Sequence, residues 1–189
     1  MSNTYIISEI GINHNGDLDL AKELINTSAG AGANAVKFQK RTIDAVYTPA
    51  ELDKYRESPW GTTNREQKEG LEFTMEQYQE LQEYTEALGL DFIVSCWDLS
   101  SLEEVSENLN VRYHKIASAL ATDRNFLEAL NETGTPVILS TGMCTAEQIE
   151  AAMDILENVE YVLACTSTYP TKPEEINLRH IETIQDDYP

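Results

Sequence analysis

Basic residues are scarce in this sequence. There are 13 Lys and Arg against 33 Asp and Glu, which gives a formal net charge of -20 over 189 residues. Binding to nucleic acid or to an anionic membrane depends on clustered Lys and Arg. The composition therefore argues against a nucleic-acid partner and against an anionic membrane surface.

Long hydrophobic runs and cysteine frameworks are also missing. No apolar stretch approaches the roughly 20 residues of a membrane span, and Tyr5-Ile6-Ile7 is too short for a signal sequence. The three cysteines, Cys96, Cys144 and Cys165, lack metal-finger spacing, and their odd number leaves one unpaired. We therefore expect a cytoplasmic protein with free thiols.

Short apolar runs alternate with helical patterns along the whole chain. The runs are nearly all apolar, as in strands that are covered on both faces. The sequence predicts strands at Thr4–Glu9, Asn34–Gln39, Leu90–Ser95, Val111–Ala117, Pro136–Ser140 and Glu160–Cys165. The fold class is α/β, and residues 1–189 are expected to form a single domain.

Two architectures fit this alternation: an open α/β sheet, or the first six of the eight units of a TIM-type (β/α) barrel. No G-x-G-x-x-G fingerprint follows the first strand, as a dinucleotide-binding sheet would require. We therefore favour the incomplete barrel.

Thr74 with Gln77, and Thr145 with Gln148, are capping boxes that predict helix starts. The long connection from Lys40 to Phe73 is expected to be a substrate loop.

Polar groups end most of the predicted strands. Glu9, Lys37 and Lys115 are the charged ones, and the hydroxyl groups belong to Ser95, Ser118, Ser140 and Ser167. In a barrel these ends would share one mouth, where catalytic groups lie. One carboxylate, two ammonium groups and several hydroxyls suit a small phosphorylated, carboxylated substrate. The structural alternatives are a turn carboxylate for Glu9 and surface-reaching side chains for the lysines.

Five motifs follow one another along the chain: Glu9-Ile10-Gly11-Ile12-Asn13-His14-Asn15-Gly16, Val36-Lys37-Phe38-Gln39, Lys115-Ile116-Ala117-Ser118, Leu139-Ser140-Thr141-Gly142-Met143 and Cys165-Thr166-Ser167-Thr168-Tyr169-Pro170. In this order and spacing they resemble the N-terminal barrel of the sialic acid synthase (N-acetylneuraminate synthase) family, and the resemblance covers essentially all 189 residues.

The resemblance implies an enzyme that condenses phosphoenolpyruvate with an N-acetylated amino sugar, such as N-acetylmannosamine, to a nine-carbon 2-keto sugar acid and phosphate. It also implies a divalent metal, Mn²⁺ or Mg²⁺. Glu9 matches a carboxylate placed for proton transfer. The substrate contacts implied by matching positions are Lys37, Lys115, Ser95, Ser118 and Ser140 for phosphoenolpyruvate, Ser167 and Tyr169 near the phosphate and sugar, and, more loosely, Asn64.

The chain also departs from the family pattern. Leu120 stands where some members carry an acid, and Ser167 where some carry Asn. The family's two metal-binding histidines belong to the seventh and eighth units, and its antifreeze-like domain lends an arginine to the partner subunit. The metal ligands are thus expected to lie outside this sequence, which resembles an incomplete barrel without the C-terminal domain. We expect the 189-residue chain alone to have little or no synthase activity.

Two other functions remain open at this point. One is a Schiff-base aldolase that uses Lys115 or Lys37, for which the chemistry needs a single desolvated lysine. The other is a non-catalytic fragment that binds ligand or assembles with a complementing chain. Because an incomplete barrel leaves strand edges free, the chain is expected to be a homo-oligomer or only marginally stable.

Overall fold

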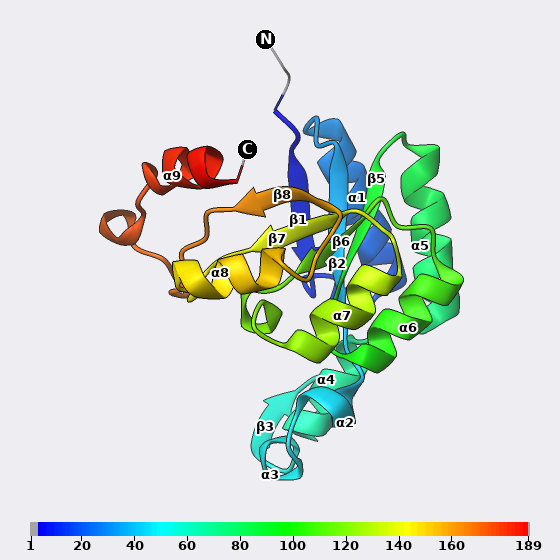
Figure 1. Cartoon of the computed structure of the whole chain (residues 1–189). Helices are drawn as coiled ribbons and strands as arrows, with labels where there is room; N and C mark the ends of the chain where they lie inside the picture. The colour runs from blue at the N-terminus through cyan, green and yellow to red at the C-terminus, as the bar shows by residue number, and fades with distance from the viewer. Residues whose placement is uncertain (1–3, 189) are drawn as a thin grey trace. The chain divides into compact units, whose positions relative to one another are not determined.

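The computed structural model describes residues 4–188 and divides the chain into two compact units, Met1–Arg112 and Tyr113–Pro189. Both units have parallel strands connected by helices, and the colours of Figure 1 follow this alternation along the chain. The predicted α/β class with parallel strands is therefore confirmed, whereas the TIM-type barrel with about six of its eight units stays a prediction.

The first unit contains a parallel sheet in the order β1 (Ile7–Gly11), β2 (Ala35–Lys40) and β5 (Asp91–Cys96). Glu9 lies opposite Lys37, and Gln39 lies opposite Ser95. The strands predicted at Thr4–Glu9, Asn34–Gln39 and Leu90–Ser95 are confirmed, with bounds shifted by one to three residues. This register places the polar groups of neighbouring strands side by side.

Three helices of the first unit follow these strands: α1 (Leu18–Gly30), α5 (Met75–Ala87) and α6 (Leu99–Asn108). The capping box of Thr74 and Gln77 is present at the start of α5, and Asp98 caps α6. Tyr78 and Leu81 of α5 are fully buried, so this face of the helix packs into the core. These caps satisfy backbone N–H groups that the first helical turn leaves without partners.

The connection after β2 is folded and is not an irregular loop. It comprises α2 (Ile43–Val46), α3 (Pro49–Leu52), a β3–β4 hairpin (Tyr55–Ser58 and Gly61–Thr63) and α4 (Asn64–Leu71). Figure 1 shows it as a cyan projection from the first unit. Gly16, at φ +70°, lies so close to this insertion that a Cβ atom would be 2.0 Å from the carbonyl oxygen of Gly70.

The second unit contains a parallel sheet in the order β6 (Tyr113–Ile116), β7 (Val137–Ser140) and β8 (Val159–Leu163). The helices are α7 (Arg124–Glu132), α8 (Ala146–Met153) and α9 (His180–Asp187), with short 3₁₀ turns at Ser118–Leu120 and Pro173–Glu175. The capping box of Thr145 and Gln148 is confirmed. Strand β8 differs from the expectation of full burial, since Glu160 and Tyr161 are exposed.

Within residues 4–188, no helix is long and apolar enough to cross a membrane. All three cysteines are free thiols, as expected, and Cys96 is buried.

Candidate functional site

The first unit brings together Glu9 of β1, Lys37 of β2 and Ser95 of β5. Lys37 is buried, and its Nζ atom lies 2.9 Å from Glu9 Oε2 and 3.2 Å from Ser95 Oγ. The parallel register explains the grouping, because Glu9 and Lys37 are paired residues on adjacent strands. Three of the residues predicted from sequence therefore form one contiguous cluster.

The environment of this cluster suits an anionic ligand. The Lys37 side chain is only 3% exposed, whereas the Glu9 side chain is 58% exposed. The Lys37 ammonium group is thus enclosed by the protein. The Glu9 carboxylate is in contact with solvent and is free to change its orientation. A buried point charge beside a hydroxyl donor can bind phosphate or carboxylate oxygens more strongly than an exposed one can, because screening is weak there.

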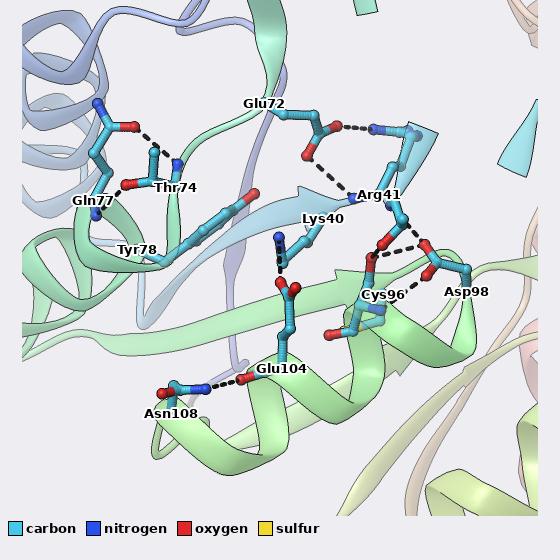
Figure 2. A network of polar contacts seen from close by, with 12 residues as sticks. Lys40, Arg41, Glu72, Thr74, Gln77, Tyr78, Cys96, Asp98, Glu104 and Asn108 are labelled. Atoms are coloured by element: carbon cyan, nitrogen blue, oxygen red, sulfur yellow. Dashed lines mark hydrogen bonds and ion pairs between the residues drawn. The ribbon is translucent and has the colours of Figure 1, made fainter. Parts of the chain in front are cut away.

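A second polar group at the end of β2 was missed by sequence reasoning. Arg41 donates a hydrogen bond from Nη2 to Gln39 Oε1, and its backbone N–H donates to Glu72 Oε2 at 3.1 Å. Figure 2 shows Glu72 reaching both the backbone and the guanidinium of Arg41. Burial raises the pKa of Glu72, against the opposing effect of Arg41. Gln39 could have been found from the sequence, because side chains alternate along a strand and Gln39 therefore lies on the same face as Lys37.

The second unit gathers Ser118, Gly142 and Ser167. The backbone N–H of Gly142 donates to Ser118 Oγ at 3.0 Å. A Cβ atom on Gly142 would lie 2.1 Å from Ser167 Oγ and 2.9 Å from Ser118 Oγ, so both hydroxyl groups surround this glycine. The absence of a side chain at residue 142 therefore allows two predicted site serines to approach each other.

The remaining predicted residues of the second unit have different surroundings. Ser140, the last residue of β7, is buried, and its Oγ atom has no hydrogen-bond partner among the described residues. Lys115 in β6 is half-buried and pairs with Ile138 of β7 in the parallel ladder. Tyr169 is fully exposed. A buried hydroxyl without a partner requires an explanation, and a ligand oxygen would supply one.

Replacing Gly142 by Ala tests the serine cluster. We expect Gly142→Ala to push Ser167 aside at a stability cost of at most about 1 kcal/mol, because Ser167 is an exposed loop side chain that can move. Binding of phosphate or phosphoenolpyruvate should weaken by more than that cost. Urea unfolding and calorimetric titration measure the two effects, and Gly30→Ala, where a Cβ meets nothing within 4 Å, is the control. Unchanged ligand affinity would contradict a role for this cluster.

Asn64 does not join either cluster. It is the first residue of α4, and its Nδ2 group donates to the carbonyl of Glu51 at 3.0 Å, inside the insertion. Its described side-chain hydrogen bond therefore holds α4 against α3. A substrate contact by Asn64 stays a prediction.

The described residues do not fit a divalent metal. No group of three or more His, Cys, Asp or Glu side chains in residues 4–188 could hold one. His14 is buried, its ring stacks on that of Phe73 at 4.1 Å, and its Nδ1 atom accepts a hydrogen bond from Gly16 N. Burial lowers the pKa of His14 and that of His114 to about 4 each. Both histidines thus belong to the packed interior.

Comparisons with known proteins agree with the motifs found in the sequence. Residues 24–189 match the model of the NeuB family. The chain is 37% identical to human N-acetylneuraminate-9-phosphate synthase over 98% of its own length and 53% of that protein. It is 34% identical to N,N'-diacetyllegionaminic acid synthase of Legionella pneumophila, over 97% of this chain and 54% of that one. The chain thus spans about half the length of the curated relatives it matches.

A solved structure shows the same likeness. The chain superimposes with a TM-score of 0.82 and 30% identity on N-acetylneuraminic acid synthetase from Leptospira borgpetersenii, which was crystallised with citrate. The match covers 99% of this chain and 62% of that one. A truncated 3-deoxy-D-arabino-heptulosonate 7-phosphate synthase from Thermotoga maritima, at 13% identity and a TM-score of 0.61, shares the fold.

Proposed function

Because the chain belongs to the NeuB family of sialic-acid-type synthases, we propose that it supplies the phosphoenolpyruvate-binding part of a sugar-acid synthase. The reaction is the condensation of phosphoenolpyruvate with an N-acetylated amino sugar, resembling N-acetylmannosamine, with release of phosphate. Lys37 and Lys115 bind the anionic groups of phosphoenolpyruvate, and Ser95, Ser118, Ser140 and Ser167 donate hydrogen bonds to its oxygens. Glu9 moves the proton, and Tyr169 contacts the sugar.

The observation that carries this proposal is the cluster of Glu9, Lys37 and Ser95. It combines a buried cation, a hydroxyl donor and a solvent-facing carboxylate within hydrogen-bond reach of one another. Fixed charges and donors stabilise charge that develops on a departing phosphate. The Glu9 carboxylate is accessible to solvent and to a substrate because its side chain is 58% exposed.

The same cluster favours phosphate chemistry over a Schiff base. A Schiff-base lysine must present a neutral amine in an apolar setting. Lys37 instead lies 2.9 Å from a carboxylate, the partner of an ammonium group. Borohydride reduction in the presence of pyruvate should therefore leave the chain without a covalent adduct, and a stable adduct on either lysine would favour the aldolase function.

Removing one lysine should weaken binding of phosphoenolpyruvate by about 1.5–3 kcal/mol, the range for a hydrogen bond to a charged group. We expect this loss for Lys37→Met and for Lys115→Met in calorimetric titrations. Lys37→Met leaves the carboxylate of Glu9 solvated, because that side chain is exposed, so the fold should tolerate it. The double variant tests whether both lysines serve the same ligand.

The matched control is Lys22→Met. Lys22 lies on α1 and pairs with Glu80 at the surface, so this variant removes the same charge without touching the strand ends. With a net charge of -20, anion affinity must come from local cations and not from the overall field. Equal affinities for the wild-type chain and both lysine variants would refute the assignment.

A further inference from the structure

The side-chain amide of Gln39 has a fixed orientation. Lys37 and Gln39 are two residues apart on β2 and therefore share a strand face. Arg41 donates to Gln39 Oε1, so the oxygen of the amide is identified by its donor. The nitrogen, Nε2, faces the end of β1, 3.4 Å from the position that a Cβ atom of Gly11 would occupy. Gln39 thus presents N–H donors toward the strand that carries Glu9.

Arg41 is itself held on two sides. Its side chain is 11% exposed, its Nη1 atom lies 3.7 Å from Glu72 Oε1, and its guanidinium carbon lies 4.6 Å from the centre of the Trp97 ring. Glu72 follows α4, and Trp97 follows β5, so two elements fix one side chain. A planar guanidinium that is paired and stacked in this way has little freedom to turn.

Two buried donors in this group lack acceptors. Arg41 Nε and Trp97 Nε1 have no hydrogen-bond partner among residues 4–188. Natural proteins rarely leave buried N–H groups unsatisfied, and such a group calls for an explanation. Together with Nε2 of Gln39, they give the adjacent ends of β2 and β5 an excess of donors, which suits a ligand with acceptor oxygens.

We propose that Arg41 is a positioning residue, which turns the Gln39 amide so that its N–H group donates to an acceptor oxygen of the bound substrate. The inference rests on the proposed function for the identity of the substrate, but the orientation of Gln39 can be measured without it. The acceptor is a carboxylate, phosphate or carbonyl oxygen, supplied by phosphoenolpyruvate or by the N-acetylated sugar.

The orientation is tested by NMR on the chain labelled with ¹⁵N-glutamine. The Gln39 side-chain signals are assigned by their loss in Gln39→Met. In the wild-type chain we expect two separate, slowly exchanging N–H signals. Arg41→Leu should move them toward the positions of a free amide and speed their exchange, whereas Arg41→Lys, which keeps a donor and a cation, should restore part of the shift. Unchanged Gln39 signals in Arg41→Leu would overturn the proposal.

A second variant separates positioning from folding. Arg41→Leu leaves Glu72 buried without its cation, which could unfold the chain. The double variant Arg41→Leu/Glu72→Leu removes both charges and should fold, yet Gln39 should still be released. Arg124→Leu is the control, because Arg124 is an exposed residue of α7 paired with Glu128. Wild-type Gln39 signals in the folded double variant would also overturn the proposal.

Binding identifies the acceptor. Phosphoenolpyruvate is titrated first, and N-acetylmannosamine is then titrated into the chain saturated with phosphoenolpyruvate. Gln39→Met should weaken one of the two titrations about three- to tenfold, the effect of one hydrogen bond. Arg41→Leu/Glu72→Leu should cause the same loss, and adding Gln39→Met to it should cause no more. Additive losses, or no loss in either titration, would contradict the proposal. If the wild-type chain binds neither compound, the proposed function fails, and the NMR result still decides the orientation.

Discussion

Acidification from pH 7 to pH 4 is expected to remove about 6 kcal/mol of folding stability, about 3 kcal/mol for each of two buried histidines. His14 and His114 are almost fully buried, and desolvation lowers the pKa of each from 6.5 to about 4. Between these two pH values the unfolded chain binds protons that the folded chain excludes. The stabilisation is therefore complete above about pH 6.5 and is lost as the pH falls toward 4. A typical domain has only about 5–15 kcal/mol in total.

Urea unfolding at pH 7, 5.5 and 4.5 measures this loss. The slope of the unfolding free energy against pH should correspond to about two more protons bound by the unfolded chain than by the folded chain. His114→Gln should reduce this difference to about one proton, because His14 still titrates. Glu72 acts in the opposite direction: burial raises its pKa, so protonating it on acidification favours the folded state. A pH dependence of stability that His114→Gln leaves unchanged would show that water reaches the His114 imidazole.

The substitution Glu9→Gln is expected to lower the rate of sugar-dependent phosphate release by about 10²–10⁴-fold, the usual contribution of a general acid or base. Glutamine keeps the size of the side chain but cannot carry a proton. The assay uses phosphoenolpyruvate and N-acetylmannosamine. It is run with the 189-residue chain, for which little turnover is expected, and with a chimera in which this chain replaces the matched segment of the human relative.

The control for Glu9→Gln is Glu104→Gln. Glu104 lies 2.9 Å from Lys40, and Figure 2 marks this ion pair with a dashed line. The variant therefore also removes the carboxylate partner of a buried lysine on β2. Lys40 points to the helix side of the strand, beneath Tyr78, and turnover should be unchanged. Equal losses in the two variants of an active chimera would mean that Glu9 acts through the fold and not through proton transfer.

Local patterns gave reliable predictions wherever local interactions decide the structure. Apolar runs marked the strands, and Thr74 with Gln77 marked the start of α5, because a capping box depends on neighbouring residues alone. The cluster of Glu9, Lys37 and Ser95 followed from strand ends plus parallel pairing. The folded insertion was missed because its order depends on distant contacts, such as the close approach of Gly16 to Gly70.

The function of Arg41 could not be read from the sequence for the same reason. Its partners Glu72 and Trp97 are far away along the chain, and nothing in a single sequence indicates which carboxylate or ring a given arginine will contact. Gln39 could have been found, since it shares its strand face with Lys37. Its orientation could not, because an amide oxygen and nitrogen are distinguished only by their partners.

The alternation of side chains along β2 restricts which insertions and deletions this gene can tolerate. Lys37 and Gln39 face the polar cluster, while Phe38 packs on the rings of His14 and Phe92 on the other face. One residue inserted near the start of β2 would move every later side chain of the strand to the opposite face. Phe38 would then face the polar cluster, and Lys37 would face the helices. The turn at 31–34, which precedes the strand and is largely exposed, can change length without that reversal. Length variation among homologous genes should therefore occur in this turn and be absent from residues 35–40.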